Sequence, residues 1–254
     1  MAPRTLQRDD RLELVQTDGR QPAAPASDVW NALPVFPVKN AHLVKNRVIT
    51  ALRRDPAHAS IDMLRTRLLQ VLQANGWKHV AVTSPTEGCG KTFVAANLAI
   101  SMARGESRRV ILMDMDMRNP ELASVFGVTN PPKLKDYLAG YSLPEEYFLR
   151  IGRSLALGLN DQPESSAAEF FLEKETASIL TEMEEVLAPD VVIYDLPPVL
   201  PHDDVVAFLP RVDGVLLVAG GGQSTAAEIS EVQRLLGDDT PLLGVVLNKA
   251  DVSA

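Results

Sequence analysis

Apolar and polar positions follow two regular patterns along the chain after residue 76. Short continuous apolar runs are typical of parallel strands that are buried on both faces. They alternate with longer segments whose apolar residues recur at helical spacing. The strand-like runs are 79–84, 109–114, 190–195, 213–219 and 242–248, with a weaker run at 154–158, and the helical segments are 91–104, 167–187 and 224–236. This order predicts an α/β fold, a doubly wound and mostly parallel sheet flanked by helices, with ligands beyond the carboxyl ends of the strands.

The first 76 residues carry a different pattern. Apolar residues lie on one helical face over 56–75, and Asn75-Gly76 supplies a stop. Residues 1–55 hold five prolines among charged and small residues without sustained periodicity, which predicts a flexible N-terminal tail or linker. A small apolar cluster inside this tail could dock on the body of the protein; it consists of Leu33, Val35 and Phe36. We therefore expect a tail over 1–55 and one folded domain over 56–254.

Composition narrows the class of protein. The 254 residues are 46% hydrophobic and 23% charged, as in an ordinary globular protein, and the formal net charge of −8 argues against a broad basic surface for nucleic acid. Cys89 is the single cysteine, so the chain cannot form an internal disulfide or complete a zinc or iron–sulfur site with cysteines. No apolar stretch reaches the length of a spanning helix, and the first 30 residues lack the apolar core of a secretory signal. The expected location is the cytoplasm, with membrane contact only at the surface or through a partner.

The segment SPTEGCGKT (84–92) lies between the first strand-like run and a helix. This order suits a phosphate cradle, in which backbone N–H groups and the helix N-terminus face the anion. Gly88 and Gly90 would let the main chain wrap the phosphates, Lys91 would reach their oxygens, and Thr92 would place its hydroxyl on Mg²⁺. The strict pattern GxxxxGK[ST] is not met, because its first glycine falls on Pro85. The candidate nucleotide-binding residues in and directly after this segment are Glu87, Gly88, Cys89, Gly90, Lys91, Thr92 and Phe93.

Acidic residues stand at the ends of two further apolar runs. Asp114 and Asp116 end VILMDMDMRNP (110–120), and Asp195 ends the run in VVIYDLPP (191–198). On an extended chain, residues two apart face the same way, so the pair would point toward the phosphate site. Two carboxylates there could hold a cation between them, or one could accept a proton from an incoming hydroxyl. A solvated strand end is the plainer alternative for the pair.

These three motifs, in this order, resemble those of the bacterial tyrosine kinases of capsule and exopolysaccharide synthesis. That family belongs to the deviant P-loop class together with the septum-site and partitioning ATPases, and the resemblance covers roughly residues 56–250. It implies a three-layer P-loop NTPase fold that uses ATP and Mg²⁺. The implied roles are Lys91, Asp114 and Asp116 in catalysis, Thr92, Asp114 and Asp195 at the metal, Asn248 near the base, and Arg118 as the arginine of the second acidic motif.

The chain also departs from that family. The self-phosphorylating members end in a tyrosine-rich tail, whereas the four tyrosines here are Tyr137, Tyr141, Tyr147 and Tyr194, so we expect the acceptor tyrosine on another chain. The family's helix ahead of the first strand carries a glutamate and two arginines for ring assembly; the matching positions are Ala59, Asp62 and Arg65, of which only the last is kept. A homo-oligomer therefore stays open.

Three functions remain in competition at this point. The first is an ATP-dependent tyrosine kinase or kinase-like regulator of polysaccharide export, which the resemblance pairs with a separate membrane protein of the chain-length-regulator type. The second is an ATPase switch that dimerises on ATP, and the third is a nucleotide-binding scaffold without phosphoryl transfer. The sequence LNKAD (247–251) adds a minority interpretation, because Asn-Lys-x-Asp is also how GTPases read guanine.

Overall fold

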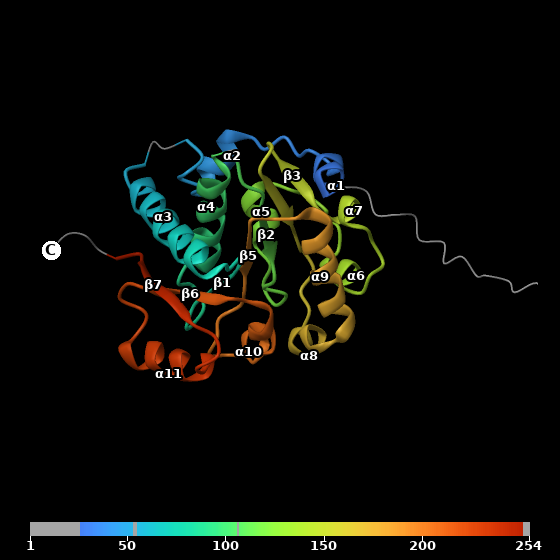
Figure 1. Cartoon of the computed structure of the whole chain (residues 1–254). Helices are drawn as coiled ribbons and strands as arrows, with labels where there is room; N and C mark the ends of the chain where they lie inside the picture. The colour runs from blue at the N-terminus through green and yellow to red at the C-terminus, as the bar shows by residue number, and fades with distance from the viewer. Residues whose placement is uncertain (1–25, 53–54, 106, 251–254) are drawn as a thin grey trace, which may run out of the picture.

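The computed structural model describes residues 26–52, 55–105 and 107–250. At its centre is a seven-stranded sheet with the order β3-β4-β2-β5-β1-β6-β7 (Figure 1). Every neighbouring pair is parallel except β3 with β4. The strands are β1 (His79–Thr83), β2 (Val110–Asp114), β3 (Leu149–Ile151), β4 (Leu155–Gly158), β5 (Val191–Asp195), β6 (Gly214–Gly220) and β7 (Leu242–Asn248). The predicted strands, including the weak one, are all present.

Helices cover both faces of the sheet and complete three layers (Figure 1). One face carries α2 (Asn40–Lys45), α3 (His58–Asn75), α4 (Lys91–Ala103) and α5 (Leu122–Phe126). The other face carries α1 (Ala26–Ala32), α6 (Leu134–Leu138), α7 (Pro144–Tyr147), α8 (Ala167–Leu172), α9 (Lys174–Leu187), α10 (Asp204–Phe208), a 3-10 turn at Leu209–Arg211, and α11 (Ala226–Leu236). The predicted α/β architecture is confirmed. None of the helices in the described ranges is both long and apolar enough to cross a membrane.

The alternation of side chains along each strand divides the core into two parts. Val80 and Val82 of β1 pack toward the layer that contains α4, whereas Ala81 between them faces the opposite layer. The expectation that every run is buried on both faces is wrong for β7. Among the described residues this strand pairs with β6 alone, and Val245 and Leu247 are 45% and 63% exposed. An apolar run at the end of a sheet has fewer neighbours to cover it.

The prediction of a flexible tail over 1–55 is wrong for residues 26–52. Helix α1 packs on α9, and Trp30 lies in the same core as the sheet, with its indole N–H donating to the carbonyl of Arg153 at 2.9 Å. The expected docking cluster is partly correct, because Leu33 is buried and the Phe36 N–H donates to the carbonyl of Arg150. Individual buried side chains, Trp30 and Leu33 among them, hold this segment in place. Because they are not regularly spaced, the hydrophobic pattern of the sequence did not indicate that the segment is folded. Residues 1–25 lie outside the described part of the chain.

Two other elements differ from the sequence pattern. The helix expected over 167–187 is divided into α8 and α9, because Glu173 takes an extended conformation with ψ of 144°. The short helices α5, α6, α7 and α10 and the antiparallel strand β3 were not predicted, since elements of three to five residues carry no measurable period.

Candidate functional site

The glycine-rich loop between β1 and α4 has the backbone shape that the sequence indicated. Gly90, which immediately precedes α4, has φ of 91°, and Gly88 has φ of 74°, a region that residues with a Cβ atom rarely adopt. A Cβ atom on Gly90 would also collide with the side-chain amide of Asn248. The loop therefore turns sharply into the N-terminus of a 13-residue helix. Free N–H groups at such a terminus attract anions, phosphates among them.

Lys91 begins α4 and lies between two carboxylates. Its Nζ is 2.7 Å from Asp116 Oδ2 and 3.6 Å from Asp195 Oδ1, and it donates to Thr92 Oγ1 at 3.3 Å. Burial by itself would lower the pKa of the ammonium group, but the charges of Asp195 and Asp116 raise that pKa above its ordinary value. Lys91 is therefore a firmly charged cation at the end of the sheet.

Asp114 and Asp195 sit side by side where β2 and β5 end. They are register partners, and both are fully buried. Asp114 Oδ2 accepts the Leu122 N–H at 2.9 Å, whereas Asp114 Oδ1 and both oxygens of Asp195 have no hydrogen-bond partner among the described residues. Burial raises the pKa of Asp195 to about 6, although the positive charge of Lys91 opposes this rise. Burial together with the negative charge of Asp195 raises the pKa of Asp114.

Buried carboxylate oxygens without donors suit a hard cation such as Mg²⁺, which prefers oxygen ligands. The Thr92 hydroxyl adds a further oxygen, and it too is buried. The described residues contain no group of three or more His, Cys, Asp or Glu placed to hold a metal ion by themselves. A cation here would thus complete its coordination with phosphate oxygens and water, which is how Mg²⁺ is usually held in nucleotide sites.

A cleft of about 690 Å³ opens beside this cluster. Of the predicted site residues, those that line it are Glu87, Gly88, Gly90, Lys91, Thr92, Phe93, Asp116 and Asn248. Cys89, Asp114 and Asp195 are buried behind the lining. The structure therefore brings the predicted loop, lysine and acidic residues together, with Asp116 at the cleft and Asp114 beneath it.

The last residue of β7 and the residue that follows it bind the glycine-rich loop. Asn248 Nδ2 donates to the carbonyl of Cys89 at 2.9 Å, and Lys249 Nζ donates to the carbonyl of Gly88 at 2.7 Å. Gln223 adds a third bond of 2.5 Å to the carbonyl of Glu87. The guanine interpretation depends on Asp251, which lies outside the described residues.

Two parts of the cleft were not found by sequence reasoning. Arg118 was expected, but its partner was not: Arg118 Nε and Nη2 both bond to the carboxylate of Asp204, which is fully buried at the start of α10. Residues 46–49 form a further wall of the cleft, ahead of every motif in the sequence. In the sequence, the HDD triplet at 202–204 was the feature that could have indicated Asp204. No motif or periodicity marks residues 46–49.

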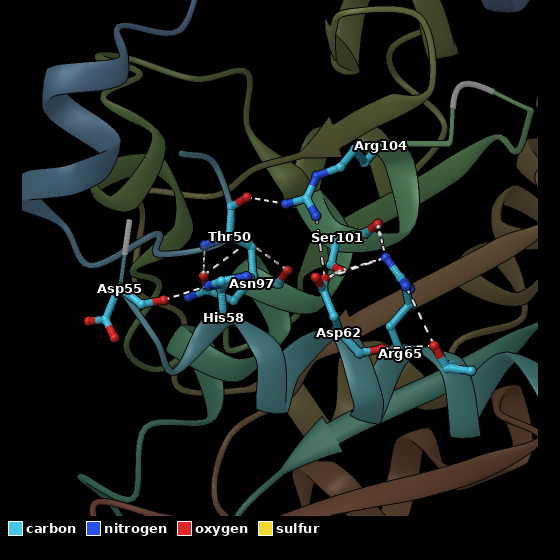
Figure 2. Close-up of polar contacts among 9 residues, drawn as sticks. Thr50, Asp55, His58, Asp62, Arg65, Asn97, Ser101 and Arg104 are labelled. Atoms are coloured by element: carbon cyan, nitrogen blue, oxygen red, sulfur yellow. Dashed lines mark hydrogen bonds and ion pairs between the residues drawn. The ribbon is translucent and has the colours of Figure 1, made fainter. Parts of the chain in front are cut away.

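The arginine kept from the ring-assembly motif is engaged within the chain. Arg65 Nη1 is 3.4 Å from Asp62 Oδ1 and donates to Ser101 Oγ at 3.2 Å, and Ser101 Oγ donates to Asp62 at 2.5 Å (Figure 2). These contacts join α3 to α4. Two of the three matching positions, Asp62 and Arg65, thus contact α4 of the same chain, while Ala59 is exposed.

Residues 80–254 match the family model described as CobQ/CobB/MinD/ParA nucleotide binding domain. The chain belongs to this family. The match includes β1 from Val80 onward, the glycine-rich loop and the acidic residues at the ends of β2 and β5, and it establishes a nucleotide-binding domain of the P-loop ATPase type.

Individual relatives point to one branch of this nucleotide-binding family. The chain is 34% identical over 202 residues to EpsB of Ralstonia nicotianae, which carries the name of a tyrosine-protein kinase; the match covers 78% of this chain and 26% of EpsB. It is 29% identical over 178 residues to the tyrosine-protein kinase YwqD of Bacillus subtilis, covering 69% of this chain and 74% of YwqD. The solved kinase domain of the Escherichia coli tyrosine kinase ETK superposes with a TM-score of 0.74 at 27% identity, covering 82% of this chain and 81% of that one. The chain therefore spans about a quarter of the longer relative.

Proposed function

We propose that this chain is an ATP- and Mg²⁺-dependent protein tyrosine kinase, or a kinase-like ATPase, that regulates capsular or exopolysaccharide synthesis and export. The observation that carries the proposal is the position of Lys91, between Asp116 and Asp195 and directly after the left-handed Gly90. That arrangement places one buried cation and several carboxylates at a helix N-terminus. The names of the relatives support the choice of tyrosine as acceptor.

The binding step follows from the loop and the lysine. Phosphate oxygens would accept hydrogen bonds from the N–H groups at the start of α4, and Lys91 would turn from the carboxylates toward the β- and γ-phosphates. A bound Mg²⁺, held by Thr92, Asp195 and Asp114, would neutralise charge that develops on the phosphate oxygens. Little covalent chemistry then falls to the protein, because positioning and electrostatics supply most of the catalysis of phosphoryl transfer.

The transfer step needs a base for the acceptor. The tyrosine oxygen attacks the γ-phosphorus in line, the bond to the β–γ bridging oxygen breaks, ADP leaves, and the phenolic proton passes to a carboxylate. Asp116 fits this role better than Asp114, since Asp116 lines the cleft while Asp114 is buried behind it and accepts the N–H of Leu122. Once Lys91 has moved to the phosphates, Asp116 is free to take the proton.

The acceptor and the partner belong to the proposal as well. We expect the acceptor tyrosine on another chain. We also expect a membrane protein of the chain-length-regulator type to bind this chain at the inner face of the plasma membrane. A homo-oligomer is a further part of this proposal, although Arg65 already contacts Asp62 and Ser101 within the chain.

Phosphotyrosine formation is the direct test of this function. The purified chain is incubated with Mg-ATP and a tyrosine-containing acceptor segment, and the products are analysed by mass spectrometry beside a Lys91→Met control. Phosphotyrosine that depends on Lys91 supports the kinase. ADP release without phosphotyrosine would instead support an ATPase switch, and binding of ATP with neither product would support a nucleotide-binding scaffold.

A further inference from the structure

Asn97 is a buried polar residue that joins the phosphate-loop helix to the N-terminal part of the chain. It lies in α4, six residues after Lys91, and is fully buried. Its Nδ2 donates to the carbonyls of Phe93 at 2.9 Å and Arg47 at 3.1 Å, and its Oδ1 accepts the Thr50 N–H at 3.0 Å. Both amide hydrogens and the amide oxygen are thus used, which leaves this joint little freedom.

Residues 46–50, which we call the strap, are fixed at their far end as well. The Thr50 hydroxyl donates toward Asn97, 3.0 Å from its carbonyl and 3.1 Å from its Oδ1. The carbonyl of Thr50 accepts a hydrogen bond from Arg104, the residue that follows α4 (Figure 2). Figure 2 shows Thr50 bonded both to Asn97 of α4 and to Arg104 just after it, so this end of the strap is anchored along α4.

The strap forms part of the candidate nucleotide cleft. Asn46, Arg47, Val48 and Ile49 line the same space as Lys91 and Thr92. Arg47 has φ of 59°, a left-handed conformation that is unfavourable for a residue with a side chain and that persists only where the surroundings impose it. The bond from Asn97 to the Arg47 carbonyl is one such constraint. Strained backbone of this kind is found at ligand clamps.

The charge of Arg47 is not used by the described part of the protein. The arginines and lysines that line the cleft are Arg47, Lys91, Arg118 and Lys249. Lys91 is bound by Asp116, Arg118 by Asp204 and Lys249 by the carbonyl of Gly88. The exposed guanidinium of Arg47 has no hydrogen bond or ion pair with the described residues. A planar guanidinium is well suited to bind phosphate.

We propose that Arg47 contacts the phosphate groups of the nucleotide bound in this cleft and that Asn97 and Thr50 are positioning residues that hold it there. The inference rests on the proposed function in one respect, namely that the ligand is a nucleotide. It adds a cation from a segment that precedes the region matched by the family model, which begins at residue 80. Binding of nucleotide and docking of the strap on α4 would then stabilise each other.

Calorimetric titration of the chain with Mg-ADP tests this contact. Replacing Arg47 with alanine is expected to weaken ADP binding about tenfold, the effect of losing one charge-assisted hydrogen bond. Arg47→Lys should keep part of the affinity, because the charge remains. Lys45→Ala is the matched control: Lys45 is an exposed cation two residues away that does not line the cleft, and its loss should leave ADP binding within about twofold of wild type.

The positioning role is tested with Thr50→Val, which keeps the shape of the side chain and removes its hydroxyl. This substitution should weaken ADP binding about threefold in the wild-type background and have almost no further effect in the Arg47→Ala background, since it acts through Arg47. Thermal unfolding of each variant shows that it is folded. The same loss of affinity in both backgrounds would overturn the positioning role.

The outcomes separate this inference from the proposed function. If the wild-type chain binds Mg-ADP and Arg47→Ala binds it equally well, the Arg47 contact is wrong and the proposed function stands. If the wild-type chain does not bind Mg-ADP at all, the proposed function fails and the Arg47 contact fails with it. If Arg47→Ala and Lys45→Ala lose affinity to the same extent, the effect comes from general surface charge, and the contact is again wrong.

Discussion

Replacing Asp195 with asparagine should stabilise the protein while it lowers Mg²⁺-dependent activity. Asp195 is fully buried, neither of its oxygens has a hydrogen-bond donor among the described residues, and Lys91 at 3.6 Å is a distant counter-charge. Its neighbours Asp114 and Asp116 are also acidic, so this end of the sheet carries more negative than positive charge. Asparagine keeps the shape of the side chain and removes one of those charges.

The size of the effect follows from the pKa. A rise from 3.8 to about 6 in the folded state means that keeping Asp195 ionised at neutral pH costs about 3 kcal/mol of folding free energy. Asparagine still buries a polar amide, so we expect a gain of about 2 kcal/mol in the free energy of unfolding at pH 7.5. For a chain of this size, that gain raises the melting temperature by roughly 4–8 °C.

The gain in stability from Asp195→Asn should depend on pH. Below pH 3.8 the carboxyl group is protonated in both states and costs nothing. Between pH 3.8 and about 6 the folded state keeps a proton that the unfolded state has released, so the stability of the wild type falls as the pH rises through this window. The advantage of Asp195→Asn should therefore be close to zero near pH 4 and complete above pH 7.

The assay is calorimetric melting of the wild type and of Asp195→Asn at pH 4, 5, 6 and 7.5. Lys91→Met is a comparison variant whose free energy of unfolding should fall instead of rise. Removing Lys91 leaves Asp116 and Asp195 buried without their cation and should cost about 3 kcal/mol at pH 7.5. An Asp195→Asn melting temperature at or below that of wild type at pH 7.5, or a gain that does not shrink toward pH 4, would refute this reasoning.

Three other predictions concern the Mg²⁺ dependence, the Arg118–Asp204 pair and the acceptor tyrosine. Asp195→Asn should weaken the Mg²⁺ dependence of ATP turnover more than Asp116→Asn does, as measured by Mg²⁺ titration; the reverse order would exchange the metal and base roles. Asp204→Asn should lower the free energy of unfolding in urea by about 2 kcal/mol, because it breaks the two-bonded pair with Arg118. Where a second copy of this chain serves as the acceptor, phosphotyrosine is expected at Tyr141, which is 83% exposed, and not at the other three tyrosines, which are buried; peptide mapping of the modified chain checks the position.

The sequence predicted those parts of the fold and the site whose signals are local. A buried strand, a glycine-rich turn and a helix follow one another within 25 residues at 79–103, so their order alone indicated the phosphate loop. Asp114 and Asp195 could be assigned to one edge because parallel strands end together, and they are indeed register partners. The packing of Trp30 was not predictable in the same way, since its partner Arg153 lies 123 residues away.

Sequence reasoning missed the long-range hydrogen bonds around the cleft for a similar reason. The bonds from Thr50 to Asn97 and from Arg118 to Asp204 span 47 and 86 residues. Each depends on one short polar side chain that is buried by tertiary packing, and no repeat or spacing marks such a residue. From sequence alone, an asparagine in a helix indicates only a lowered helix propensity. Its structural role becomes visible once its hydrogen-bond partners are known.

The buried charges of this site lower the free energy of unfolding. Under the proposed function, the same charges also couple ligand binding to catalysis. Asp116 and Asp195 raise the pKa of Lys91, so the lysine remains charged while it is buried. When phosphate oxygens enter the cleft, Lys91 can exchange carboxylate partners for phosphate partners without a change in its own charge. Asp116 then loses the ammonium group that lies 2.7 Å away and becomes a better proton acceptor. Because the base is freed only when phosphate is bound, the same ion pair that stabilises the fold would also delay activation of the acceptor until the nucleotide is in place.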